Sequence, residues 1–181
     1  MIKSVLRGFA LAAAMSAVAF AAAKNPVVGG AAMFDSKNII ENAVNSKDHT
    51  TLVAAVKAAG LVETLQGPGP FTVFAPTNKA FGKLPAGTVE SLVRPENKQK
   101  LTTILTYHVI PGKLSAADLM KAAKHGTTYK TAAGGTLSFK SAGGGKVQVI
   151  DAMGGRSTVT IPNVFQSNGV IHVVDTVLLP S

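Results

Sequence analysis

The residues of this sequence that could act as acids, bases or metal ligands are few and widely spaced. The 181-residue chain contains two tyrosines, no cysteine and four histidines, which are His49, His108, His125 and His172. The lack of cysteine excludes a disulfide framework, a thiolate zinc site, an iron–sulfur cluster and a cysteine nucleophile. No two histidines have the His-x-x-x-His or His-Glu-x-x-His spacing of a helical metal site. We therefore predict no catalytic residue, no metal site and no cofactor.

One histidine lies close in sequence to a carboxylate. His172 and Asp175 are three residues apart in a segment with the apolar character of a strand. Side chains three apart on a strand point to opposite faces, so these two cannot pair there without a bulge. Because buried polar groups are nearly always hydrogen-bonded, we predict that His172 is a core residue bonded to the backbone.

Tyr107 and His108 are the residues for which the sequence leaves two roles open. They leave a predicted helix just before Pro111, where neighbouring side chains point one inward and one toward the surface. A ring with a polar tip is favoured in interfaces, but it also suits a core that supplies a hydrogen bond. We name Tyr107 and His108 as candidate partner-binding residues, with a core role as the alternative.

The glycines and the positive charge could suggest phosphate or nucleic-acid binding. Gly143-Gly144-Gly145-Lys146 matches part of a phosphate loop, but Val147 replaces the Ser or Thr and the first glycine is missing. A hairpin turn is the better interpretation. The lysines are scattered without interleaved aromatic residues, which disfavours a specific nucleic-acid partner. Outside a cell, the net charge of +7 that remains after removal of residues 1–23 instead favours weak attraction to anionic glycans or membrane surfaces.

Residues 1–23 have the pattern of a signal peptide. Lys3 and Arg7 precede an uncharged stretch that ends in the small residues Ala21-Ala22-Ala23. That stretch is shorter than the ~20 apolar residues needed to span a bilayer, which disfavours a membrane anchor. Cleavage before Lys24 would leave 158 residues with a net charge of +7. We expect a secreted or periplasmic protein with no transmembrane segment after cleavage.

The predicted secondary structure that positions these residues changes from mainly helices to mainly strands near the middle of the chain. Helical spacing and capping residues dominate the first half, whereas alternating strands separated by glycines dominate the second. The predicted helices are 36–45 (capped by Ser36), 48–60 (capped by Asp48), 61–65, 78–84, 95–107 and 115–125. The predicted strands are 71–75, 128–131, 136–140, 146–150, 158–161 and 170–179. We predict one α+β domain over residues 35–181, after a short N-terminal segment, 24–34.

Three segments resemble the signature motifs of the fasciclin domain family. FTVFAPTNKAF (71–81) resembles the first box, SNGVIHVVDTVLLP (167–180) the second, and YHVIPGKL (107–114) the tyrosine–histidine segment between them. The motifs occur in the family's order, and the likeness extends over residues 35–180. The resemblance implies a single wedge-shaped β-sandwich flanked by helices. It also implies non-enzymatic cell adhesion or extracellular-matrix binding by a bacterial secreted protein.

The residues of the first box also have structural interpretations. Thr77 or Asn78 can cap the helix that follows the strand, and Phe81 is expected to pack inside. The leading hypothesis is an adhesion module whose partner is an extracellular protein or an anionic polysaccharide, acting as a monomer. The alternative is a small-ligand or lipid carrier that uses a cleft of the same domain. A hydrolase ranks last, because no nucleophile, base and acid can be assembled.

Overall fold

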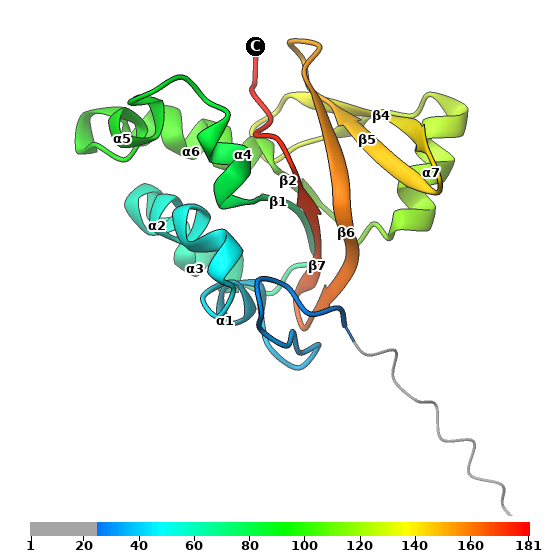
Figure 1. The fold of residues 1–181 in the computed structure, drawn as a ribbon, viewed down its shortest axis with the longest axis horizontal. Helices are drawn as coiled ribbons and strands as arrows, with labels where there is room; N and C mark the ends of the chain where they lie inside the picture. The colour runs from blue at the N-terminus through cyan, green and yellow to red at the C-terminus, as the bar shows by residue number, and fades with distance from the viewer. Residues whose placement is uncertain (1–24) are drawn as a thin grey trace, which may run out of the picture.

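The computed structural model describes residues 25–181 (Figure 1). The predicted signal peptide, 1–23, lies outside the described residues. The helices are α1 (Ile39–Ala43), α2 (Thr50–Ala59), α3 (Val62–Gln66), α4 (Asn78–Gly82), α5 (Thr88–Leu92), α6 (Lys98–Tyr107) and α7 (Ala116–His125), with 3-10 turns η1 (Lys47–His49) and η2 (Pro95–Asn97). The strands are β1 (Phe71–Pro76), β2 (Val109–Pro111), β3 (Tyr129–Lys130), β4 (Thr136–Gly143), β5 (Lys146–Ile150), β6 (Arg156–Gln166) and β7 (Gly169–Val174). Within this part of the chain, no helix has the length and apolar character needed to cross a membrane.

All seven strands belong to one curled sheet. Their order is β2-β1-β7-β6-β5-β4-β3, and every pair is antiparallel except β1 with β7. The sheet curls until its ends approach, since the N–H of Ala132 donates to the Val109 carbonyl at 2.8 Å. The two facing layers of the wedge thus come from one sheet. The predicted α+β class and single domain are confirmed.

The curled sheet separates two hydrophobic cores, and Figure 1 shows α1–α6 on one side of the sheet and α7 on the other. We call the first the helix-side core: it lies between α1–α6 and the outer face of β1 and β7, and includes Val56, Val73 and Ile171. The second, the sheet-side core, lies within the curl under α7 and includes Tyr107 and Val149. Adjacent residues of one strand serve different cores, because successive side chains point to opposite faces.

Several helix ends follow local sequence signals. α7 begins with the predicted Ser115, which forms a capping box with Asp118, and Gly60 ends α2 in the left-handed conformation. The predicted caps at Ser36 and Asp48 are wrong. α1 begins later, with a capping box from Asn38 to Glu41, because Glu at the third helical position can return a hydrogen bond to the cap. α2 has no side-chain cap, and Asp48 lies in η1.

The turn before the last strand ties distant segments together. Gln166 pairs with Gly169, so Ser167 and Asn168 form the turn and Gly169 already belongs to β7. The Asn168 side chain accepts from the Ile39 N–H at 3.1 Å and donates to the carbonyl of Leu65 at 2.6 Å. One amide therefore joins the start of α1 and the end of α3 to the last hairpin.

Candidate functional site

Tyr107 lies wholly in the sheet-side core, with none of its surface exposed. Its hydroxyl donates to the Thr136 carbonyl at 2.9 Å and accepts from the Ala152 N–H at 2.8 Å. Burial raises the pKa of the Tyr107 phenol, which keeps it protonated. The polar tip thus bridges two backbone groups inside the fold.

His108 is also buried, and both of its ring nitrogens are in use. Nδ1 donates to the Ile104 carbonyl at 2.8 Å, and Nε2 accepts from the Leu178 N–H at 2.9 Å. Since a backbone N–H can only donate, this pair of contacts assigns the proton to Nδ1. Burial lowers the pKa of His108 to about 4, so the ring is neutral near pH 7.

The structure therefore places both candidate partner-binding residues in the core, which is the alternative role that the sequence left open. Neither Tyr107 nor His108 presents a side chain to the surface. Partner binding through this segment stays a prediction that only binding data can test. The sequence contained a signal for the burial of His108, because Leu101, Ile104, Leu105 and His108 have the spacing of one buried helical face.

The other polar candidates do not converge on a catalytic centre. His172 is fully buried; its Nε2 donates to the Leu114 carbonyl at 2.7 Å, and its Nδ1 accepts from the Asn163 N–H at 3.2 Å. The predicted backbone-bonded core histidine is confirmed. Asp175 instead accepts from the Thr158 N–H at 2.8 Å. Within residues 25–181, no three histidine or acidic side chains are grouped to hold a metal ion.

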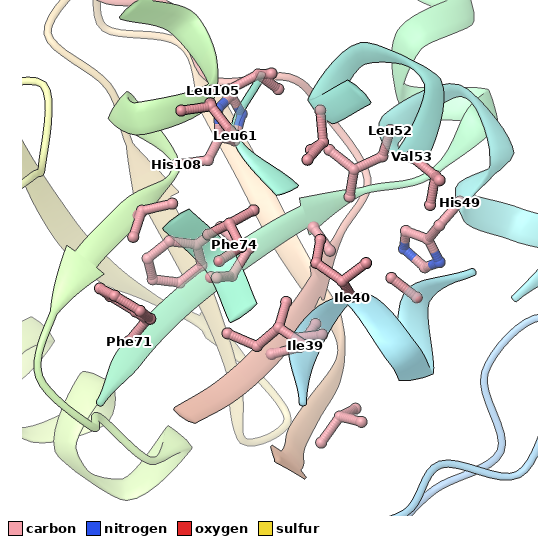
Figure 2. A pocket seen from close by; sticks show the side chains of 18 of the residues that line it. Ile39, Ile40, His49, Leu52, Val53, Leu61, Phe71, Phe74, Leu105 and His108 are labelled. Atoms are coloured by element: carbon pink, nitrogen blue, oxygen red, sulfur yellow. The ribbon is translucent and has the colours of Figure 1, made fainter. Parts of the chain in front are cut away.

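The helix-side core contains an apolar cavity of about 90 Å³ (Figure 2). It lies between the first helices and the strands β1 and β7, and none of the described residues that line it carries a formal charge at neutral pH. Its walls are mainly aliphatic, with contributions from Ile39, Ile40, Leu52, Val56, Val73, Leu105 and Ile171. Such a cavity can accept a compact apolar group, and only a few of its lining residues can orient it.

Two histidines line this cavity, and they differ in their hydrogen bonds (Figure 2). His108 has both nitrogens paired, as described above. His49 is 3% exposed; its Nδ1 lies 2.8 Å from Ser46 Oγ, but its Nε2 has no hydrogen-bond partner among residues 25–181. Burial lowers the pKa of His49, an effect that the nearby Ala75 carbonyl opposes without forming a hydrogen bond of acceptable geometry. Sequence reasoning missed this residue, because its neighbours are set by tertiary packing.

The surface charge is concentrated on one segment. Residues 113–156, which include α7 and β3–β5 and end at the first residue of β6, contain seven basic and two acidic residues, an excess of five positive charges. All seven basic side chains are exposed: Lys113, Lys121, Lys124, Lys130, Lys140, Lys146 and Arg156. Residues 25–112 contain eight basic and six acidic residues, an excess of only two. The segment 113–156, which we call the basic segment, is therefore the part that most attracts polyanions.

Comparison with known proteins identifies a family model and several proteins that this chain resembles. The family model described as "Fasciclin domain" matches residues 47–180. Protein sll1483 of Synechocystis is 50% identical over 98% of this chain and 93% of its own length. Cell surface glycolipoprotein MPB83 of Mycobacterium bovis is 33% identical over 88% of this chain and 68% of its own length. A solved FAS1 domain pair from the insect cell adhesion molecule Fasciclin I superposes with a TM-score of 0.70 at 20% identity, covering 79% of this chain and 51% of that one.

Proposed function

The chain belongs to the fasciclin domain family, and from this premise we propose that it is an exported, non-enzymatic adhesion module. It binds an anionic polysaccharide or an acidic protein surface by complementarity of charge and shape, without turnover. The single observation that carries the choice of partner is the basic segment, where seven basic side chains are exposed. The helix α7 and the strands β3–β5 position most of these charges.

A role without catalysis agrees with how two of the three buried histidines are used. A general base needs a ring nitrogen that can reach a substrate proton. Both nitrogens of His108 and of His172 are bonded to backbone groups instead. The mycobacterial relative MPB83 is a cell surface glycolipoprotein, which supports a location outside the cytoplasm for this chain as well.

The proposed partner class can be tested by binding to an immobilised anionic polysaccharide, such as alginate, at low and high salt. We expect binding that weakens as salt rises, because exposed charges are screened. A Lys140→Glu/Lys146→Glu variant reduces the excess charge of the basic segment from five to one. It should bind about tenfold more weakly.

A matched variant separates the basic segment from total charge. Lys57→Glu/Lys98→Glu changes the net charge by the same amount on α2 and α6, where both lysines are exposed. It should retain most of the binding. Equal losses in the two variants would show that only net charge matters. Salt-independent binding that both variants retain would exclude an electrostatic partner.

The proposed export has its own test. The exported protein should begin at Lys24, since the charged, apolar and small-residue order of residues 1–23 directs cleavage after Ala23. N-terminal sequencing of the protein recovered from the periplasm or medium gives the answer. An intact Met1 on a membrane-retained form would contradict both cleavage and export.

A further inference from the structure

The cavity of the helix-side core combines apolar walls with one unused hydrogen-bonding group. A polar atom buried without a partner destabilises the fold, and native folds rarely tolerate it without a reason. His49 Nε2 is such an atom within the described chain, and His49 lines the cavity. A ligand that fills the cavity and reaches Nε2 would remove this cost.

The hydrogen bond from Ser46 to the same ring indicates what Nε2 offers. Ser46 is 2% exposed, and its hydroxyl forms this one side-chain hydrogen bond in the described chain. If Nδ1 donated to Ser46 Oγ, the hydroxyl proton would itself lack an acceptor. The arrangement that leaves fewer orphan groups has the Ser46 O–H donating to Nδ1, which puts the ring proton on Nε2. His49 therefore presents an N–H donor.

We propose that this cavity binds a compact, neutral, largely apolar ligand with one hydrogen-bond acceptor, a carbonyl or hydroxyl oxygen, that receives the N–H of His49. The ligand is neutral because no described residue that lines the cavity is formally charged at neutral pH. We assign the acceptor to His49 because the other lining histidine, His108, already has both nitrogens paired. This site goes beyond the surface adhesion proposed above and assigns a ligand class to the carrier alternative.

The volume and the position of the cavity limit the ligand further. A dry apolar cavity of ~150 Å³ accepts benzene, so about 90 Å³ suits a smaller ring or the end of a longer chain. Two of the lining residues, Thr64 and Ala132, are exposed, which brings the cavity close to solvent. A longer molecule can therefore bury one end at His49 and leave the remainder outside.

A pair of probes with the same shape tests the recognition. Cyclobutanone carries the acceptor, and methylenecyclobutane replaces its oxygen with an apolar CH₂. Both are titrated into the full mature chain while backbone amide resonances are followed by NMR. We expect shifts at the cavity residues Val56, Val73 and Ile171, with Val149 of the sheet-side core as the internal reference.

The His49→Leu variant then isolates the hydrogen bond. It should weaken cyclobutanone binding about fivefold to tenfold and change methylenecyclobutane binding less than twofold. The Ser46→Ala/His49→Leu variant also removes the Ser46 hydroxyl, which the single substitution leaves without a partner. It should lose the preference for cyclobutanone to the same extent as His49→Leu and keep the native melting temperature. This second variant separates lost recognition from lost folding.

Two results would overturn the proposal. If the cavity amides respond to neither probe up to the solubility limit, the cavity is closed to ligands. If both variants weaken the two probes equally, His49 does not recognise the acceptor. Neither result bears on the adhesion proposal, which is measured by polysaccharide binding through a different part of the surface.

Discussion

The two cores on either side of the sheet differ in how completely they use their space and their polar groups. In the sheet-side core, the Tyr107 hydroxyl makes two backbone hydrogen bonds at the centre of packed apolar side chains. In the helix-side core, a cavity of about 90 Å³ remains, and His49 Nε2 has no partner in the described chain. The polar groups of the sheet-side core are therefore better paired, whereas the helix-side core retains free space and an unpaired nitrogen.

The largest effect should follow from removing two adjacent buried rings, Tyr107 in the sheet-side core and His108 beside the cavity. A Tyr107→Ala/His108→Ala variant removes two buried rings and leaves several backbone groups unpaired, so it should lose 5 kcal/mol or more, about the whole stability of a marginal domain. Phe81→Ala in the helix-side core, where Phe81 is 6% exposed, should lose about 3–5 kcal/mol. Chemical denaturation of both variants measures the two losses. A double variant that melts like the wild type but no longer binds a partner would restore the contact role for Tyr107 and His108.

The next largest effect is a loss of stability at acidic pH. The pKa of His108 is about 4 in the folded protein and 6.5 in an unfolded chain, so the unfolded state binds more protons between these values. The free energy of unfolding should therefore be at its full value above pH 6.5 and decrease as the pH falls to 4, by about 3 kcal/mol from this residue. Burial also lowers the pKa of His49 and His172, which adds loss in the same direction. Denaturation curves from pH 7 to 4.5 measure the slope, and an unchanged stability over that range would contradict it.

Replacing each of the two histidines that line the cavity should give a smaller difference in stability. His108→Leu leaves the Leu178 N–H and the Ile104 carbonyl without partners, so it should cost about 1–3 kcal/mol. Ser46→Ala/His49→Leu removes a group that is already unpaired, so stability should stay within about 0.5 kcal/mol of the wild type or increase. Thermal melts of the two variants compare them. Equal destabilisation would show that His49 is as well satisfied as His108.

The smallest effect should come from one substitution, valine to isoleucine, made in each core to compare the free space of the two cores. Val73 lines the cavity and Val149 lies in the sheet-side core, and both are buried strand residues. Val73→Ile adds a methylene into free space and should be neutral or stabilise by up to about 1 kcal/mol. Val149→Ile has no cavity to fill and should cost about 1–3 kcal/mol. Urea titrations resolve this difference, and a Val149→Ile variant as stable as Val73→Ile would remove the packing contrast.

The elements that rest on local chemistry were predictable from the sequence. Lys146–Ile150 is a strand with the predicted limits, because period-two alternation and flanking glycines define it locally. The helix α5 and the short strand β2 were not predicted, because packing and pairing with distant segments stabilise them. The fasciclin likeness provided the overall architecture.

The candidate site was much less predictable than the fold. The sequence drew attention to Tyr107 and His108 as rings with polar tips, and hydrogen-bond partners 29 and 70 residues away place both inside. The cavity depends on side chains from helices and strands that meet only in the tertiary structure. An unpaired nitrogen on His49 is a property of those neighbours, so no local pattern marks it.

The parallel pairing of β1 with β7 governs the order in which the chain can fold. Phe71 pairs with Gly169, and Asn168 holds the ends of α1 and α3. The chain is synthesised from its N-terminus. The early helices therefore have no completed sheet to pack against until the last hairpin has been made. Contacts this distant in sequence form slowly, because a long loop must close before they are made. We expect a polypeptide with this topology to complete its fold only after almost all of it has been synthesised, a property that would suit the proposed export.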